Sequence, residues 1–176
     1  MEHVVAAAAE LLREHPPEAI TVRDVAGRAG HHHRFVAAWF GGKTGLFLEA
    51  FDRLAAEAAS ALGFPAIRAS IAPEVVRVAR LMNWLVANDP SAFAHRRATP
   101  LIDRVTRIYA EDLGLGPDLA RLAAQRVIAG AISLVLFPDP LGLGPDDVGR
   151  HIALEVRVAM LLKESADRET GPGADS

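Results

Sequence analysis

The sequence predicts an all-α fold, for three reasons. Alanine and leucine are abundant while aromatic residues make up only 6% of the chain, a composition that favours helices. Apolar residues recur at helical spacing, and no segment keeps the alternation of a half-buried strand. With 176 residues, 51% of them hydrophobic, the chain can bury the cores of one or two helical domains.

The first two helices are predicted from their boundary residues. One helix is expected over Val4 to Glu14. Thr21 precedes the next apolar-periodic run and can accept a backbone N–H as its N-cap, while Asp24 suits the positive end of the helix dipole. Gly30 follows the last periodic residue, where a left-handed backbone favours glycine. A short second helix is therefore predicted between Thr21 and Gly30.

A third helix resumes near His32 and ends at Gly41-Gly42, and a longer helix is expected to begin near Gly45. Two short helices around a glycine turn form a helix-turn-helix, which places its second helix in the major groove of DNA. Local charge agrees with this prediction. The net charge of the chain is −3, but residues 21–45 hold four arginine or lysine residues against one acid.

Three segments carry a resemblance to a known family: Ile20-Thr21-Val22-Arg23-Asp24-Val25-Ala26, Ala29-Gly30 and Trp39-Phe40-Gly41-Gly42-Lys43-Thr44-Gly45-Leu46. Together with the first helix they make residues 1–54 similar to the N-terminal DNA-binding domain of the TetR family of bacterial transcriptional repressors. The chain departs from the family at His31, where valine is usual, and at Ala37, where a tyrosine often contacts a phosphate. The resemblance implies an N-terminal three-helix helix-turn-helix domain followed by a C-terminal helical domain that binds a ligand and dimerises.

The resemblance places the DNA contacts on the two helices of the motif and the corner after them. Arg23 and Lys43 are expected to anchor phosphates. His33 and Arg34 are expected to read bases, since arginine can donate a pair of hydrogen bonds to guanine, and Phe35 is a candidate for contact with a thymine methyl group. The full set of predicted DNA-binding residues is Thr21, Arg23, His32, His33, Arg34, Phe35, Trp39 and Lys43.

The run His31-His32-His33 raises the alternative of a metal site, since imidazole is a common ligand. Adjacent side chains on a helix point about 100° apart, so three in a row do not converge on one ion. Contact of His33 with DNA is therefore favoured, and a pH-dependent DNA affinity remains a further hypothesis. No metal and no cofactor are predicted.

Beyond the helix-turn-helix the chain is predicted to stay helical. Gly63-Phe64-Pro65 interrupts the helix that starts near Gly45, and a shorter helical stretch is expected before Pro73. Pro100 is expected to kink or divide its helix, because proline removes a backbone donor. Further helices are predicted over Pro73 to Ala87, Ser91 to Leu113, Asp118 to Phe137 and Pro145 to Ala166. The predicted domains are residues 1–48 and 49–168, followed by a disordered tail at 169–176.

In the resembling family the second domain binds a small effector and pairs two subunits through its last two helices. The candidate pocket residues are Phe64, Met82, Trp84, Leu85, Phe93, Ile108 and Tyr109, with His95, Arg96 and Arg97 as possible polar handles. The candidate dimer interface consists of Leu119, Leu122, Gln125, Arg126, Ala129, Ser133, Ile152, Val156 and Ala159. The alternatives are ordinary core or surface roles for the pocket residues, and a monomer that buries its helices internally.

The predicted function is a dimeric DNA-binding repressor that a small molecule releases from a pseudo-palindromic operator. An enzyme is not expected, because the sequence holds no nucleophile elbow, phosphate loop, dinucleotide fingerprint or His-Glu-x-x-His motif. The alternative is a degenerate ligand-binding protein of the same fold that no longer binds DNA specifically. The absence of cysteine and of a visible signal peptide predicts a cytoplasmic protein without membrane contact.

Overall fold

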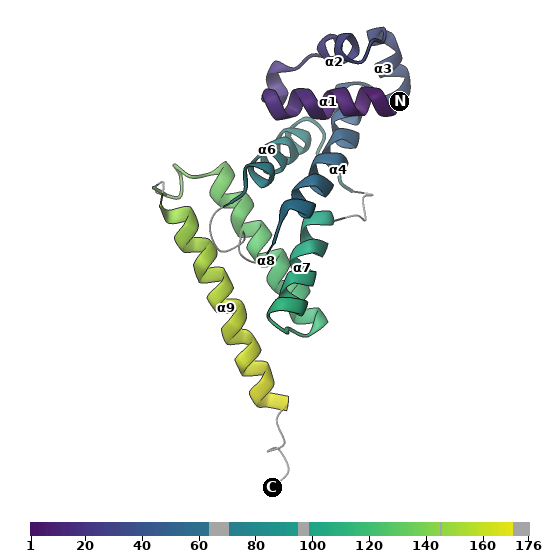
Figure 1. Cartoon of the computed structure of the whole chain (residues 1–176). Coiled ribbons are helices and arrows are strands. Elements are labelled where there is room, and N and C mark those ends of the chain that lie inside the picture. Colours follow the sequence, from purple (N-terminus) through teal and green to yellow (C-terminus); the bar gives the residue numbers. More distant parts are fainter. Residues whose placement is uncertain (64–70, 95–98, 145, 171–176) are drawn as a thin grey trace. The chain divides into compact units, whose positions relative to one another are not determined.

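The computed structural model describes residues 1–63, 71–94, 99–144 and 146–170. Within these residues the chain contains eight α-helices, one short 3₁₀ helix and no strand, so the all-α prediction is confirmed (Figure 1). The elements are α1 (Glu2–Glu14), η1 (Pro17–Ala19), α2 (Val22–Arg28), α3 (His33–Phe40), α4 (Lys43–Ala61), α6 (Pro73–Asn88), α7 (Pro100–Asp112), α8 (Pro117–Leu136) and α9 (Asp147–Thr170).

The chain divides into two compact units. The first contains residues 1–58 and 73–98, and the second contains residues 59–72 and 99–176. The first unit therefore holds most of α4 together with α6, whereas the predicted boundary left only the start of α4 in the N-terminal domain and assigned α6 to the C-terminal one. The expected boundary at residue 48 falls inside α4, which is one continuous helix that buries Leu46, Phe47, Ala50, Leu54 and Ala58.

The start and end of α2 follow the predicted boundary signals. The Thr21 hydroxyl accepts a hydrogen bond from the backbone N–H of Asp24 at 3.2 Å, and the Asp24 carboxylate accepts one from the backbone N–H of Thr21 at 2.7 Å. This reciprocal capping box satisfies two backbone donors that the helix itself leaves free. Gly30 has a φ of 69°, as expected for glycine just after a helix.

The corner between α3 and α4 is tighter than predicted. α4 begins at Lys43 rather than near Gly45, because the backbone N–H of Leu46 already donates to the carbonyl oxygen of Gly42. A side-chain carbon at Gly45 would collide with the carbonyl oxygen of Phe40. Glycine is therefore required here for α4 to leave so close to the end of α3.

The core of the first unit is built from α1, α2, α4 and α6. Figure 1 shows α2 and α3 on one side of α1 and α6 on the other. Aromatic contacts join α4 to residues 73–98 of this unit. The ring centroids of Phe47 and Trp84 are 5.2 Å apart, and those of Phe51 and Phe93 are 5.1 Å apart. The buried side chains on α1 and α6 are Val4, Ala7, Ala8, Ala9, Leu11, Leu12, Val75, Val78, Ala79, Leu81 and Leu85.

The second unit is formed mainly by α7, α8 and α9. α7 begins at Pro100, so proline divides the helix expected over Ser91 to Leu113, and the chain forms a turn over residues 91–94. Proline also opens α8, at Pro117. An ion pair between Arg126 Nε and Glu155 Oε2, 2.7 Å long, joins α8 to α9.

The remaining boundaries differ slightly from prediction. α9 begins at Asp147, whose carboxylate accepts the backbone N–H of Gly144 at 2.7 Å, and it reaches Thr170, two residues into the expected tail. Phe64, Pro65, Pro145, the stretch His95-Arg96-Arg97 and residues 171–176 lie outside the described residues.

One described helix, α8, is long and apolar enough to cross a membrane by length and composition alone. A helix that packs in the interior of a helical domain has the same properties. α8 carries Arg121 and Arg126, both paired with acids of neighbouring helices in its own unit. The pairing fits a helix packed among other helices.

Candidate nucleic-acid interface

The surface of α3 is almost entirely open. Val36 is the one buried residue among the eight of this helix, and it anchors α3 to the core. The side chains of Arg34, Phe35, Ala37 and Trp39 are exposed. As the second helix of a helix-turn-helix, α3 therefore presents a wide free face of the kind that enters a DNA groove.

An aromatic ladder runs along this face. The rings of Phe35 and Trp39 are stacked, with centroids 5.5 Å apart and an interplanar angle of 19°, because residues four apart lie on one side of a helix. The ring of His31 meets Trp39 edge-on at 5.5 Å. The guanidinium carbon of Arg34 lies 5.2 Å from the centroid of Phe35. Phe35 and Trp39 are still 39% and 37% exposed, so the ladder is a flat, accessible surface.

The three histidines have different structural positions. His32 caps α3, since its Nδ1 accepts the backbone N–H of Arg34 at 3.3 Å. The ring of His33 stacks on that of His32 with centroids 4.3 Å apart. Among the described residues, no group of three or more histidines and acids could hold a metal ion. His32 thus has a local role in starting the recognition helix, and His33 remains free to reach DNA.

Fewer cations of the helix-turn-helix are available to contact DNA than the sequence suggested. Both terminal nitrogens of Arg28 donate to the carboxylate of Glu14 at 2.9 Å. This hydrogen bonding raises the pKa of Arg28 and lowers the pKa of Glu14. Arg23, in contrast, is exposed and has no ion-pair partner among the described residues. Arg23 and Arg34 are the cations of this motif that are available for phosphates or bases.

Lys43 differs most from its expected role. Its ammonium donates to the carbonyl oxygen of Pro17 at 2.7 Å and lies over two rings, 5.2 Å from the centroid of Phe47 and 4.8 Å from that of Trp84. Partial burial lowers the pKa of Lys43. In the chain without DNA, the side chain that was expected to hold a phosphate connects η1, α4 and α6.

Comparison with known proteins agrees with this geometry. Residues 4–50 match the family of bacterial regulatory proteins, tetR family. The matched segment contains the whole helix-turn-helix and the α3–α4 corner. Residues 4–50 thus form an N-terminal domain of the TetR type. It is the domain of a DNA-binding transcriptional regulator, as the sequence motifs predicted.

A solved member of the TetR family shares the fold along most of the chain. The TetR family repressor AlkX from Dietzia sp. strain DQ12-45-1b, implicated in biodegradation of n-alkanes, superposes with a TM-score of 0.54. The identity is 22%, over 92% of this chain and 94% of that one. At this identity the likeness concerns the fold. Among curated proteins no sequence relative is detected.

The predicted effector-pocket residues are divided between the two units. Met82, Trp84, Leu85 and Phe93 belong to the first unit, where Leu85 is fully buried and Trp84 packs on Phe47. Ile108 and Tyr109 are buried in the second unit, and Phe64 lies outside the described residues. The pocket prediction grouped them because apolar periodicity does not reveal which unit a helix joins.

The predicted dimer residues fall into two groups. On α8, Leu122, Gln125, Arg126, Ala129 and Ser133 are exposed along one face, and Leu119 is half-buried. On α9, Ile152, Val156 and Ala159 are at most 5% exposed within a single chain, so they are not available to a partner subunit. The large apolar side chains that α9 leaves exposed are Leu154, Met160, Leu161 and Leu162.

The aromatic ladder on α3 was not predicted, although the residue spacing that indicates it is visible in the sequence. Phe35 and Trp39 stand four residues apart, and His31 stands eight residues before Trp39. Phe35 and Trp39 were each predicted to contact DNA, and both are exposed, but the stacking of their rings was not predicted. The spacing predicts a shared helix face, whereas the direction of that face follows from the packing of α3 on the core.

Proposed function

We propose that the protein is a homodimeric transcriptional repressor that leaves its operator when a small effector binds in the second unit. The observation that carries the DNA-binding part is the open face of α3, with Arg34, Phe35 and Trp39 exposed on a helix anchored by Val36. A recognition helix needs such a face, because direct readout requires side chains that reach the base edges.

The side chains of α3 favour particular base contacts. Arg34 is suited to guanine, where a bidentate pair contributes about 1–3 kcal/mol of discrimination. The stacked rings of Phe35 and Trp39 offer an apolar surface for thymine methyl groups. Arg23, at the exposed start of α2, is suited to a phosphate. The predicted half-site therefore contains a guanine beside one or more thymines.

Dimerisation is supported by the exposed apolar side chains of α8 and α9. Leu122 is 63% exposed, and Leu154 and Leu161 are 55% and 61% exposed. Large apolar side chains on two helices of one unit are typical of a surface that another chain covers. A twofold dimer places two recognition helices about 34 Å apart and predicts a pseudo-palindromic operator.

Effector binding is supported by the buried hydroxyl of Tyr109. No described residue forms a hydrogen bond with its Oη atom, although the side chain is 1% exposed. An unpaired buried hydroxyl costs about 1–3 kcal/mol, which a ligand with a polar group would recover. We therefore place the effector near Tyr109 and Ile108 in the second unit, with an apolar body and few polar groups.

Selection of binding sites from a pool of randomised duplexes tests the DNA-binding part. The protein is expected to enrich a motif with twofold symmetry, and Arg34→Ala is expected to lose preference at one position of each half-site. Arg150→Ala, which removes an exposed cation of α9, serves as the control and should enrich the same motif. Enrichment of no motif by the wild-type protein would contradict the proposal.

A second function, a ligand-binding protein of this fold without specific DNA binding, is favoured by two observations. Ala37 supplies no phenol at a position where a tyrosine often contacts DNA. Lys43 and Arg28 are already engaged within the protein, so few cations remain for phosphates. The site-selection experiment separates the two functions directly.

A further inference from the structure

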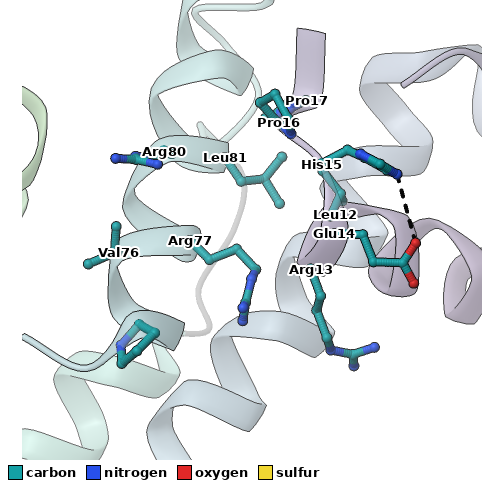
Figure 2. A pocket seen from close by; sticks show the side chains of 11 residues that line it. Leu12, Arg13, Glu14, His15, Pro16, Pro17, Val76, Arg77, Arg80 and Leu81 are labelled. Atoms are coloured by element: carbon teal, nitrogen blue, oxygen red, sulfur yellow. Dashed lines mark ion pairs between the residues drawn. The ribbon is translucent and has the colours of Figure 1, made fainter. Parts of the chain in front are cut away.

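A cavity of about 350 Å³ lies between the end of α1 and the first half of α6, within the first unit (Figure 2). Its walls combine apolar and cationic side chains. The apolar lining is Leu12, Pro16, Pro17, Pro73, Val76 and Leu81. The ionisable lining is Arg13, Glu14, His15, Arg77 and Arg80. Cations therefore outnumber acids around a partly apolar space.

The charges of this cavity are unevenly compensated. Glu14 is neutralised by Arg28, which donates two hydrogen bonds to it, and Arg13 is neutralised by Glu57 at 2.7 Å. Neither Arg77 nor Arg80 has a hydrogen bond or ion pair with any described residue. The cavity thus carries an uncompensated positive charge that comes from α6.

Arg77 is the residue that faces this space. It is half-buried, whereas Arg80 is exposed. Figure 2 shows Arg77 extending from α6 toward Arg13 of α1, while Arg80 points away from the α1 residues. Arg77 has no acceptor among the described residues, and a carboxylate or phosphate oxygen is the acceptor that matches the planar geometry of a guanidinium best.

We propose that this cavity binds a small organic anion, with its carboxylate or phosphate group on Arg77 and its apolar body against Leu81, Val76 and Pro16. Such a ligand would join α1 to α6. The site is distinct from the effector site proposed near Tyr109, because its lining residues all belong to the first unit. It also lies across α1 from α3, so its occupant is not the DNA that α3 contacts.

The test uses the full chain without DNA, so its outcome is independent of the proposed repressor function. Phenyl phosphate and benzoate are titrated by calorimetry, with benzyl alcohol as the neutral probe of similar size. We expect saturable binding of at least one anion at millimolar concentration, and weaker or no binding of the alcohol. The methyl NMR signals of Val76 and Leu81 should shift on binding, while those of Leu122 in the second unit should not.

Two variants test which arginine of the cavity binds the anion. Arg77→Gln is expected to weaken anion binding at least about tenfold, because a charge-assisted hydrogen bond is lost. Arg80→Gln removes a second lining charge, whose side chain points away from the α1 residues, and is expected to weaken binding clearly less than Arg77→Gln does. The proposal is overturned if neither anion binds, if benzyl alcohol binds as well as the anions, or if Arg77→Gln and Arg80→Gln act alike.

Discussion

The ammonium nitrogen of Lys43 lies 4.8 Å from the centroid of the Trp84 ring, so the first residue of α4 contacts the C-terminal half of α6. The same ammonium donates to the carbonyl oxygen of Pro17. The ring contacts and the carbonyl acceptor favour the folded state, the desolvation that lowers the pKa of Lys43 offsets part of this, and a net stabilisation of about 1 kcal/mol remains. Lys43 is thus a structural residue of the first unit in the absence of DNA.

Lys43→Met is expected to lower the free energy of unfolding by that amount, since methionine keeps the apolar stem and loses the charge. Denaturant unfolding followed by tryptophan fluorescence measures this change, because Trp84 reports on the contact. Lys163→Met is the matched control. Lys163 is the only other lysine, and its exposed pair with Asp167 contributes at most about 0.5 kcal/mol.

The same variant separates the structural role of Lys43 from the phosphate contact expected from the sequence. If Lys43 stays engaged with Pro17 when DNA binds, Lys43→Met leaves the salt dependence of DNA affinity nearly unchanged. Arg23→Gln should reduce the slope of log affinity against log salt by about one. An equal reduction by both variants would show that Lys43 turns outward to a phosphate.

The capping box of α2 predicts a specific loss of stability in acid. Hydrogen bonds from the Thr21 hydroxyl and backbone hold the pKa of Asp24 below its ordinary value of 3.8. A lowered folded-state pKa stabilises the protein above the unfolded-state pKa, and this stabilisation disappears as pH falls through the folded-state pKa. Asp24→Asn should therefore be less stable than the wild type at neutral pH, with a difference that shrinks below pH 3.8.

Thermal unfolding at a series of pH values measures this difference. Asp118→Asn is the control, because Asp118 also lies in the first turn of a helix but α8 has no side-chain cap. A gap between Asp24→Asn and the wild type that stays constant with pH would rule out the capping carboxylate as its source.

Tyr109 predicts a loss of stability at high pH. Burial, reinforced by the charge of Glu155, raises the pKa of this tyrosine to about 12. The free energy of unfolding is therefore unaffected by this tyrosine below its ordinary pKa of 10.0. It decreases as pH rises from 10.0 toward 12, by on the order of 2 kcal/mol in all. Tyr109 is the only tyrosine, so ultraviolet absorbance of tyrosinate follows its titration without overlap.

Tyr109→Phe tests the role of the same hydroxyl by removing it. It removes the unpaired hydroxyl, so we expect it to be neutral or stabilising by about 1 kcal/mol and to weaken the loss of stability above pH 10.0. A native titration midpoint close to 10.0 would mean that water reaches the hydroxyl.

The exposed face of α8 predicts the effect of a charge on dimerisation. Leu122→Glu places a carboxylate in the proposed interface and is expected to weaken the dimer at least about tenfold, as measured by sedimentation velocity over a range of concentrations. Leu141→Glu introduces the same charge at another exposed leucine, outside both α8 and α9, and should not change the association. Equal association of both variants would exclude α8 as the interface.

The features that the sequence predicted well depend on neighbouring residues. The Thr21 cap, the turn at Gly30 and the break at Pro100 each follow from backbone chemistry within a few residues. The family resemblance then supplied the fold of the N-terminal domain, because its segments keep their order and spacing.

The features that were missed depend on contacts between distant parts of the chain. The contacts of Lys43 with Pro17 and Trp84 were not predicted, because these partners belong to other elements. Ile152 and Val156 were assigned to a dimer because periodicity shows that a face of α9 is apolar, and does not show that the same chain already buries it. Propensity and periodicity give the elements, and tertiary packing decides the partner of each face.

Fluorescence anisotropy with the intergenic DNA beside the protein's own gene tests the central claim most directly. The titration is made at two salt concentrations and in the presence of excess random duplex. Sequence-specific regulation predicts tight binding that resists the competitor and weakens steeply with salt. Binding that the random duplex abolishes, or no binding at either salt concentration, would contradict the claim that the open face of α3 reads an operator there.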